Sequence, residues 1–429
     1  MLAALDDIVG VEKLIKFFDI TKSGKSCRGV RMRILLVHNF YRAGAPGGED
    51  VVFRQEKELL SEAGHEVTCF TRSNDEMDEN RLSDRLRVVW DMAYSRRTVR
   101  DLSEIVRRVR PDVAHFHNTF PLISASGYEA CVAEGIPIVQ TIHNFRLVCG
   151  AATHFRDGAT CERCTAGNPW PAVRHACYRG SRMASLAVAS MLHQTQRART
   201  RWDPVDRYLA LTPFTARRLI AAGIPRGRVT VKPNFVEVCE DSGDAPARRE
   251  RFVFVGRLSE EKGVRFLLHA WRELHQVPLS IVGEGPLRLE LEAYAREHAL
   301  SVHFAGLLDR TAVRNLVRSS CAVVVPSLCF EGGVPLSLLE AMAVRTPIIA
   351  SRLGGVPELV TDGIDGLLFE PGDPGQLVTQ VRRLISDPVM RELVAQRGLQ
   401  TVTRVHGRRA NLDALLKVYT TVCRGRPAR

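Results

Sequence analysis

Two cationic side chains follow one strand-like segment in the second half of the chain. The apolar residues Phe252–Val255 run directly into Gly256 and Arg257, and Lys262 comes soon after. At the carboxyl end of a buried strand, an arginine can bind two oxygens at once and a lysine acts as a point charge, which suits a diphosphate. A solvated surface pair is the alternative, and the position at a strand-to-helix turn disfavours it. We therefore expect Arg257 and Lys262 to bind phosphate.

Two glutamates follow another apolar segment. Residues 322–325 lead into a loop with Glu331, Gly332 and Gly333, and Glu340 lies one or two turns into the next expected helix. A carboxylate can accept both hydroxyls of a ribose, as acidic residues do in dinucleotide sites, and a second one can hold sugar hydroxyls. Two isolated glutamates would ordinarily be surface residues, but the leucines and proline around these two oppose that interpretation.

A glycine-rich loop follows the first strand-like segment of the chain. Gly44, Gly47 and Gly48 precede a helix pattern, and Glu49 and Asp50 come directly after them. Glycines there let backbone amides approach a phosphate at the helix N-terminus. A simple tight turn is the alternative. The spacing is not G-x-G-x-x-G, which weakens a dehydrogenase interpretation.

Histidines and cysteines make up the remaining candidates in the first half. His115 and His117 alternate on one expected strand, so at most one of them faces a ligand, and a packed role is favoured for His115. Cys149, Cys161, Cys164 and Cys177 form C-x11-C-x2-C-x12-C in an insertion at residues 145–182. This pattern indicates a structural zinc site, in which the metal replaces a missing core. Free buried thiols, an iron–sulfur cluster and disulfides stay open, and His154 or His175 can substitute as a ligand.

Strand and helix signals alternate along the chain, as parallel α/β units require. The expected strands are 33–38, 65–72, 112–117, 138–143, 207–211, 229–231, 252–255, 279–282, 302–305, 322–325 and 347–350. The expected helices are 50–63, 263–274, 286–298, 310–319, 336–344 and 375–386. The series occurs twice, so we expect an α/β fold of two Rossmann-like domains that face each other across a cleft. Ligands should bind at the carboxyl ends of the strands.

The domain boundaries follow from this series. We expect an N-terminal domain at 32–236, a polar linker at 237–251, a C-terminal domain at 252–405, and a C-terminal helix and tail at 406–429. Residues 1–31 hold half of the lysines of a chain that otherwise uses arginine, and a strand pattern starts abruptly at Met32. We expect a poorly packed extension there, with a genuine N-terminal helix as the alternative.

Composition excludes several classes of protein. An apolar content of 45% and a charged content of 25% in 429 residues are ordinary for a soluble globular protein. No apolar run approaches the roughly 18 residues of a transmembrane helix, and no signal peptide is evident. The net charge of +12 favours anionic partners. Because no nucleic-acid-binding motif is present, we expect no nucleic-acid partner.

The motifs together resemble those of the family 4 glycosyltransferases, which have the GT-B fold. The second half contains G-R-L-S-x-E-K-G, V-G-E-G-P, E-G…P-L…L-E-A-M-A and G-G-V-P-E-L-V. The first half contains a Gly-Gly loop, G-H-E-V, P-D-V-A-H-F-H, T-I-H and V-K-P-N. The resemblance covers about residues 32–405. Each motif alone is weakly specific, and their order along the chain is highly specific.

The resemblance implies a role for each matching residue. Arg257 and Lys262 match the pair that binds the donor diphosphate, Glu340 the carboxylate on the nucleotide ribose, and Glu331 the one on the transferred sugar. His143 matches a histidine beside the donor sugar that is important for transfer. The loops with Gly47, Gly48, Gly285, Gly332 and Gly333 belong to the same donor site, and the acceptor side is expected at His117 and Asn118. One more residue than usual separates Glu331 from Glu340. Either the Gly-Gly loop accommodates the extra residue, or Gly332 occupies the expected place and backbone amides bind the sugar.

The resemblance also implies a retaining, hexosyltransferase-type reaction without a catalytic metal, and no Asp-x-Asp motif contradicts this. Arg257 and Lys262 would stabilise the departing nucleoside diphosphate, whose phosphate accepts the proton of the attacking hydroxyl during front-face attack. The expected partners are a nucleotide-sugar donor and a lipid-linked or saccharide acceptor of polysaccharide synthesis. The expected location is the cytoplasm, with peripheral contact at the inner face of the membrane, where Ser181–His193 and the following Arg197, Arg199 and Arg201 can rest on anionic lipid. A solvated helix face is the alternative for this segment. The alternatives are a nucleotide-sugar epimerase of the same fold and a non-catalytic sugar-nucleotide-binding protein.

Overall fold

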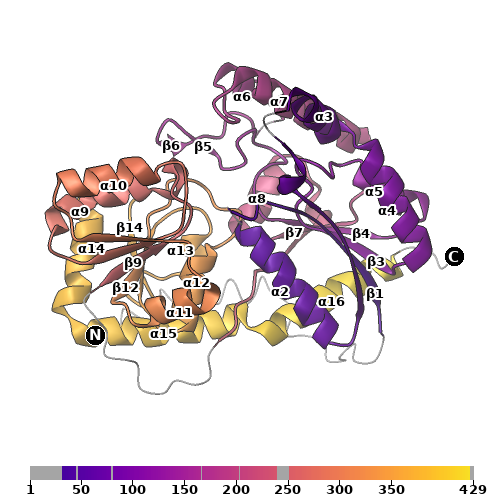
Figure 1. The fold of residues 1–429 in the computed structure, drawn as a ribbon. Helices are drawn as coiled ribbons and strands as arrows, with labels where there is room; N and C mark the ends of the chain where they lie inside the picture. The colour runs from indigo at the N-terminus through magenta and orange to yellow at the C-terminus, as the bar shows by residue number, and fades with distance from the viewer. Residues whose placement is uncertain are drawn as a thin grey trace. The chain divides into compact units, whose positions relative to one another are not determined.

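The computed structural model describes residues 31–44, 47–78, 81–165, 167–201, 203–238 and 251–425 (Figure 1). Nearly all of the expected N-terminal extension, most of the expected linker and the last four residues of the expected tail lie outside these ranges. The described chain divides into two compact units. The N-terminal unit comprises residues 31–154, Cys161–Asn234 and 411–425, and the C-terminal unit comprises Phe155–Thr160 and Phe235–Ala410.

The N-terminal unit is built on a parallel sheet of six strands. Its order is β2-β1-β3-β4-β7-β8, and every pair in it is parallel. The strands are β1 (Arg33–Phe40), β2 (Glu66–Ser73), β3 (Val113–Phe116), β4 (Ile138–Ile142), β7 (Arg207–Ala210) and β8 (Val229–Val231). The strand order reverses between β1 and β3, and such a switch point is where doubly wound sheets bind ligands.

Helices cover both faces of this sheet. The helices of the unit are α2 (Gly48–Glu62), α3 (Leu82–Ala93), α4 (Arg96–Val109), α5 (Gly127–Ala133), α6 (Pro171–Arg174), α7 (Arg182–Arg201), α8 (Pro213–Ala221) and α16 (Arg408–Arg424), with 3-10 turns η2 (Asn74–Glu76) and η3 (Arg226–Arg228). The last helix of the chain returns to this unit. Leu415, Val418 and Tyr419 of α16 pack with Phe53 and Leu60 of α2 on the sheet face.

The C-terminal unit has a second parallel six-stranded sheet, in the order β11-β10-β9-β12-β13-β14. Its strands are β9 (Phe252–Val255), β10 (Leu279–Val282), β11 (Val302–Gly306), β12 (Ala322–Val325), β13 (Ile348–Ser351) and β14 (Leu367–Phe369). In sequence order this is 3-2-1-4-5-6, the order of dinucleotide-binding sheets, with its switch point between β9 and β12. The structure thus confirms the expected pair of Rossmann-like units.

The helices of the C-terminal unit alternate with its strands. They are α9 (Val264–Trp271), α10 (Arg288–Glu297), α11 (Arg310–Arg318), α12 (Leu336–Ala343), α13 (Val356–Leu359), α14 (Pro374–Ser386) and α15 (Pro388–His406), with 3-10 turns η4 (Glu260–Lys262) and η5 (Arg272–Leu274). Most expected strands and helices begin and end within two residues of the observed ones. Among the described helices, none combines the length and apolar character needed to cross a bilayer.

The expected cysteine-rich insertion has little regular structure. Apart from α6, the described residues of the range 145–181 contain only the two-residue strands β5 (Phe155–Arg156) and β6 (Ala159–Thr160), which form a hairpin. Five non-glycine residues of this segment have a positive φ, a conformation that costs about 1–2 kcal/mol each. They are Ala152, His154, Asp157, Ala176 and Arg179. The segment therefore depends on contacts other than helix or sheet hydrogen bonds.

Candidate functional site

The switch point of the C-terminal unit carries the two expected cations. Arg257 follows β9 and is exposed, and its guanidinium has no hydrogen-bond or ion-pair partner among the described residues. Lys262 ends the 3-10 turn η4, and its Nζ lies 2.6 and 2.8 Å from the two carboxylate oxygens of Glu331. Ser327 Oγ donates to Glu331 Oε1 at 2.9 Å. Lys262 and Glu331, both expected site residues, therefore contact each other directly in the loops after β9 and β12.

The electrostatics of Lys262 follow from this pair. Burial alone would lower the pKa of its ammonium group, but the carboxylate of Glu331 outweighs burial, with smaller contributions from Cys329 and Glu261, and the pKa lies above its usual value. Lys262 is thus a permanent cation at neutral pH. An incoming anion would compete with Glu331 for it.

Glycines let the loops of this site lie backbone to backbone. Gly263 has a φ of +71°, and a Cβ there would overlap the carbonyl oxygen of Pro326 in the loop after β12. A Cβ on Gly283 or Gly285 would overlap the carbonyl oxygens of Gly256 or Leu258 in the loop after β9. Gly285 was expected in the donor site from its motif alone. The close approach of the two loop backbones explains why this position requires glycine.

Glu340 lies in the second turn of α12, as expected, and is half-buried. Burial raises the pKa of its carboxyl group, and Arg310 and Arg314 of α11 oppose the increase. Its carboxylate has no hydrogen-bond partner within the described ranges, so it can accept hydroxyl groups of a ligand. Gly332 and Gly333 are buried in the loop that leads into α12.

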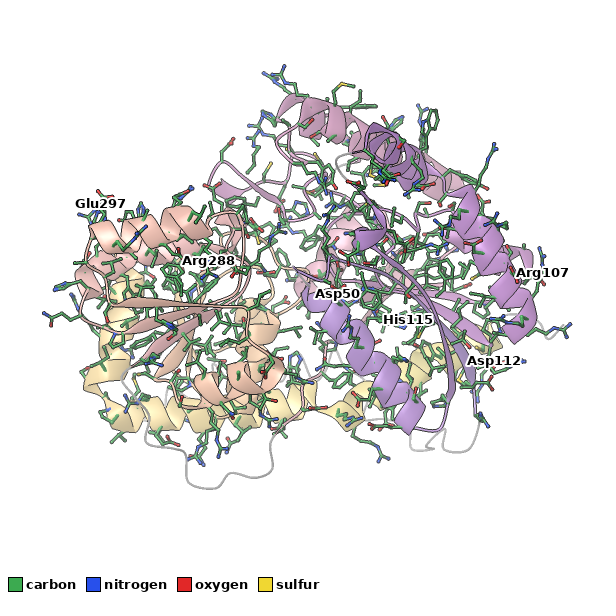
Figure 2. All side chains as sticks on the ribbon, viewed as in Figure 1. Asp50, Arg107, Asp112, His115, Arg288 and Glu297 are labelled. Carbon is green, nitrogen blue, oxygen red and sulfur yellow. The ribbon has the colours of Figure 1, made fainter. Side chains whose placement is uncertain are left out.

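In the N-terminal unit, the glycine loop forms a turn fixed by Asp50. Gly47 is the N-cap of α2, and its N–H donates to Asp50 Oδ2 at 3.0 Å. Oδ1 of the same carboxylate accepts from His38 Nε2 at 2.8 Å, in the interior marked by the Asp50 label in Figure 2. The amide of Gly47 is therefore used within the protein. Gly48 is exposed at the first position of the helix, where an N–H has no partner inside the helix.

Glu49, beside these glycines, is a buried carboxyl group. Burial raises its pKa from 4.5 to about 7, and the Tyr41 hydroxyl, Arg146 and Asn144 only partly offset that increase. The Asn144 side chain donates to Glu49 Oε2 at 3.3 Å. Glu49 thus links the glycine loop to the residue after His143, which we did not expect from the sequence.

The two expected histidines of this unit contact each other. His143 follows β4 and is half-buried, and its Nε2 lies 2.9 Å from Nδ1 of His117. His117 is only 2% exposed, so it lies behind His143 and away from solvent. Asn118 donates to Asn39 O at 2.8 Å and accepts from Phe120 N at 3.0 Å. Both ends of its amide therefore hold the strand-end loops together.

A buried polar cluster lies behind these histidines. Of its members, the sequence singled out only His117 and His115. His115 is fully buried, as its favoured interpretation required, and it contacts Thr141 and Tyr419. Glu56 and Lys232 are also fully buried and form an ion pair. One feature of the sequence could have indicated this ion pair: Lys232 is a lysine next to an apolar strand, in a chain that otherwise uses arginine.

The four clustered cysteines are reduced in this structure. Cys149 and Cys164 are buried, and Cys161 and Cys177 are half-buried. Burial, together with the three other thiols, raises the pKa of Cys164 to about 11. The four thiols are therefore close enough to influence one another. Among the described residues, however, the one group of three ligand atoms within 4.8 Å of each other is Glu56, His115 and His117.

Two doubly wound parallel sheets with these strand-end sites define the GT-B fold. The solved structure of the Anabaena protein HepE in complex with UDP and glucose matches with a TM-score of 0.63 and 17% identity, over 91% of this chain and 100% of that chain. The chain belongs to the group 1 glycosyltransferases of family 4. The model described as Glycosyltransferase Family 4 matches residues 46–240, and that described as Glycosyl transferases group 1 matches residues 249–387. The protein is therefore a glycosyltransferase.

Curated relatives agree with this assignment. The alpha-D-kanosaminyltransferase of Streptomyces kanamyceticus is 27% identical over 297 residues, which are 67% of this chain and 71% of that protein. A lipopolysaccharide core biosynthesis glycosyltransferase of Rhizobium meliloti is 30% identical over 226 residues, 50% of this chain and 64% of that protein. Relatives of the chain thus include an enzyme of lipopolysaccharide synthesis.

Proposed function

We propose that this glycosyltransferase moves a sugar, with retention of its anomeric configuration, from a nucleoside-diphosphate donor to a lipid-linked or saccharide acceptor in cell-surface polysaccharide synthesis. The observation that carries the proposal is the group of side chains after β9 and β12 of the C-terminal unit. It combines an exposed arginine without a partner among the described residues, a lysine paired with the Glu331 carboxylate, and a half-buried carboxylate on the next helix. The complex of HepE with UDP and glucose supports a UDP-sugar as the donor.

Each of these side chains has a part in the proposed reaction. The donor diphosphate would attract Lys262 away from Glu331, which frees the carboxylate for sugar hydroxyls. Arg257 and Lys262 then stabilise the charge that develops on the leaving phosphate. Glu340 accepts the ribose hydroxyls. The departing phosphate takes the proton of the acceptor hydroxyl during front-face attack, so no protein nucleophile is required.

A thermal-shift panel of UDP-, GDP-, ADP- and dTDP-sugars tests the donor assignment. A ligand that binds only the native state raises the melting temperature, and we expect UDP-sugars to do so. Arg257→Ala should abolish the shift without lowering the melting temperature of the free protein, because the guanidinium has no partner to lose. If no nucleotide sugar stabilises the protein, the proposal is wrong. Proton NMR of the first product formed then tests retention, and an inverted anomer would exclude it.

The surface of the N-terminal unit supports a membrane-associated acceptor. Trp90 of α3 and Met183 of α7 are each 76% exposed, and Trp170 and Leu186 are also exposed on the neighbouring segments. The two helices pack together through Met92, Val188 and Leu192, among others. Exposed arginines on the same segments include Arg87, Arg179 and Arg182. Aromatic and apolar side chains flanked by arginines are typical of surfaces that bind anionic lipid.

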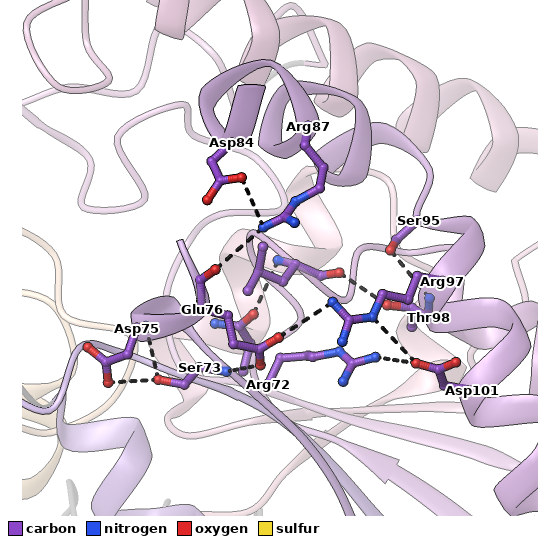
Figure 3. Close-up of polar contacts among 12 residues, drawn as sticks. Arg72, Ser73, Asp75, Glu76, Asp84, Arg87, Ser95, Arg97, Thr98 and Asp101 are labelled. Atoms are coloured by element: carbon purple, nitrogen blue, oxygen red, sulfur yellow. Dashed lines mark hydrogen bonds and ion pairs between the residues drawn. The ribbon is translucent and has the colours of Figure 1, made fainter. Parts of the chain in front are cut away.

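The base of α3 is held by a network of ion pairs (Figure 3). Arg72 lies 2.5 Å from Asp101, and Arg97 lies within 4.0 Å of both Asp101 and Glu76. These contacts connect the end of β2 and the turn η2 to α4, and Arg87 of α3 donates to the carbonyl oxygen of Glu76 at 3.4 Å. A pocket of about 340 Å³ opens between α3, α5 and α7, lined by Tyr94, Phe120, Tyr128, Arg146, Met191 and Leu192. We assign to it the apolar chain of a lipid-linked acceptor at the inner face of the membrane.

Co-sedimentation with vesicles tests the membrane contact. We expect the protein to bind phosphatidylglycerol vesicles and to bind phosphatidylcholine vesicles much less. Trp90→Glu with Met183→Glu should abolish binding, whereas Leu289→Glu, on a leucine that is 81% exposed in the C-terminal unit, should not. Equal binding by the double variant and the wild type would exclude this surface.

For the cysteine cluster we propose one structural zinc ion. The proximity of the four thiols and the strained, irregular backbone of the segment support it. Zinc–sulfur bonds of about 2.3 Å would draw the four sulfurs closer together than they lie here. Elemental analysis of freshly prepared, reduced protein should find about one zinc per chain, lost in Cys161→Ser with Cys164→Ser and kept in Cys69→Ser. Protein without metal would exclude the site, and iron would favour the cluster alternative.

A further inference from the structure

The buried polar cluster behind His143 has a defined direction of hydrogen bonding. Its members are Glu56 on α2, His115 and His117 around β3, and Lys232 after β8, each at most 2% exposed. Figure 2 labels His115 within the N-terminal unit. A buried polar group costs free energy unless it is paired, so the protons of this cluster must be placed consistently.

Oε1 of Glu56 contacts one partner, whereas Oε2 has two neighbours, because Nδ1 of His115 also lies 3.8 Å from it, although this nitrogen is already hydrogen-bonded to the Tyr419 hydroxyl. Oε1 accepts from the ammonium group of Lys232, and the two charges neutralise each other. Oε2 lies 3.5 Å from Nε2 of His117. Neither Oε2 nor this Nε2 has a hydrogen-bond partner elsewhere in the described structure, although both are buried. The two atoms are therefore each other's remaining partner.

This cluster does not suit a metal ion, although Glu56, His115 and His117 place ligand atoms close together. The Lys232 ammonium already bonds the carboxylate, so a second cation would be repelled. Both ring nitrogens of His115 are also in use: Nδ1 lies 2.7 Å from the Tyr419 hydroxyl and Nε2 lies 2.8 Å from Thr141 Oγ1. The geometry instead favours a chain of hydrogen bonds that leads to His143.

The carboxylate of Glu56 sets the direction of that chain. An ionised carboxylate only accepts hydrogen bonds, so Nε2 of His117 carries its proton and Nδ1 has the lone pair. Nδ1 of His117 lies 2.9 Å from Nε2 of His143, so Nε2 of His143 must be the donor. In a neutral imidazole the other nitrogen is then an acceptor. Nδ1 of His143, which has no hydrogen-bond partner among the described residues, is left with an unshared pair.

The rings are neutral at physiological pH. Burial places the pKa of His117 and of His143 well below the usual value, and the neighbouring histidines and the Lys232 ammonium lower both further. His115 has its pKa lowered in the same way, by burial and by Lys232. His143 is thus a neutral imidazole with a single proton, and the position of that proton decides what it offers to a ligand.

We propose that Glu56 and His117 are positioning residues that fix the tautomer of His143, so that its Nδ1 accepts a hydrogen bond from a hydroxyl group of the bound sugar. The inference rests on the proposed function for the identity of the ligand, but not for the tautomer itself. A sugar that lacks this hydroxyl leaves a buried acceptor unpaired, so the chain of contacts also determines specificity.

Nitrogen NMR of protein labelled with [15N]histidine tests the tautomers directly. In the wild type we expect a protonated Nε2 and an unprotonated Nδ1 in both His117 and His143, with assignments taken from His117→Asn and His143→Asn. Glu56→Gln should reverse both rings. In this variant the glutamine oxygen still accepts from Lys232, so the glutamine NH₂ group faces Nε2 of His117. Because an NH₂ group donates, Nε2 of His117 must then carry the lone pair. A wild-type His143 protonated on Nδ1, or rings unchanged in Glu56→Gln, would overturn the proposal.

Activity supplies the second measurement. Glu56→Gln should lower kcat by roughly tenfold or more, as loss of a partner that orients a functional histidine does. The control is Tyr419→Phe, which removes the hydrogen bond to His115 in the same cluster but leaves the contact between Glu56 and His117. It should keep the wild-type tautomers and turnover. The NMR result is independent of turnover, so a failure of the proposed function would appear separately, as the absence of any shift with nucleotide sugars.

Discussion

Replacing Gly263 by alanine should both destabilise the C-terminal unit and disturb its donor loops. The residue has a φ of +71°, and a side chain in this left-handed region costs about 1–2 kcal/mol. In addition, the new methyl group would overlap the Pro326 carbonyl oxygen, a backbone atom that cannot rotate away. Overpacking of this kind costs about 1–3 kcal/mol. We therefore expect a loss of about 2–5 kcal/mol in the free energy of unfolding.

Gly363 provides a matched control in the same unit. Its φ is +74°, nearly that of Gly263, but a Cβ there would meet nothing within 4 Å. Gly363→Ala should therefore show only the conformational cost, about 1–2 kcal/mol. Urea denaturation followed by tryptophan fluorescence measures both losses, because Trp271 is fully buried in this unit. The difference between the two variants isolates the overlap with Pro326.

The functional consequence follows from the same contact. Gly263 brings the turn that carries Lys262 against the loop that leads to Glu331, so the overlap should move these loops apart. We expect Gly263→Ala to lose most of the stabilisation by UDP-sugars, while Gly363→Ala keeps it. Equal stability and equal ligand response in the two variants would refute the role of the close approach.

Three further predictions concern charge. Lys262→Ala should lower turnover by about 10²-fold or more with the fold intact, whereas Arg265→Ala, whose guanidinium binds Glu260 and Glu290, should remain near wild type in the same steady-state assay. Because the pKa of Glu49 rises from 4.5 to about 7 on folding, the stabilisation that its protonated form provides is complete below pH 4.5 and is lost as the pH rises through 7. Relative to the wild type, the free energy of unfolding of Glu49→Gln should therefore increase by up to about 3 kcal/mol across that pH interval. A difference in urea unfolding that does not change with pH would contradict this. Transfer should persist during brief exposure to excess EDTA, since two cations already face the diphosphate; an immediate loss rescued by magnesium would mean that a metal neutralises it.

The sequence predicted the elements that local pattern specifies. Strands such as β9 and β12 are continuous apolar runs that are followed by glycine or proline, so their predicted bounds agree with the structure. The three-residue strand β14 was not predicted although the equally short β8 was, because an apolar run of three residues carries too little pattern to distinguish a strand from a loop. The leucines that predicted α12 also placed Glu340 one or two turns into that helix, where the structure has it.

The contacts between distant residues were beyond local pattern. From the sequence we expected Lys262 and Glu331 to bind separate parts of a ligand, and the structure pairs them across 69 residues. Glu56 and Lys232 are 176 residues apart, and His115 and Tyr419 are 304 apart. Nothing in one segment specifies a partner at such separations, since the partner is selected by the packing of the whole sheet.

The return of the last helix to the N-terminal unit has a consequence for how the chain is made. Residues 411–425 belong to a unit whose other described segments end at Asn234, and they supply Leu415, Val418 and Tyr419 to its core. During synthesis on the ribosome, most of the N-terminal unit therefore emerges first, but the sheet face that α16 covers cannot be fully buried until residues 411–425 have also emerged. The C-terminal unit can complete its own core earlier, so the part of the protein that is made first should be the last to reach its native state.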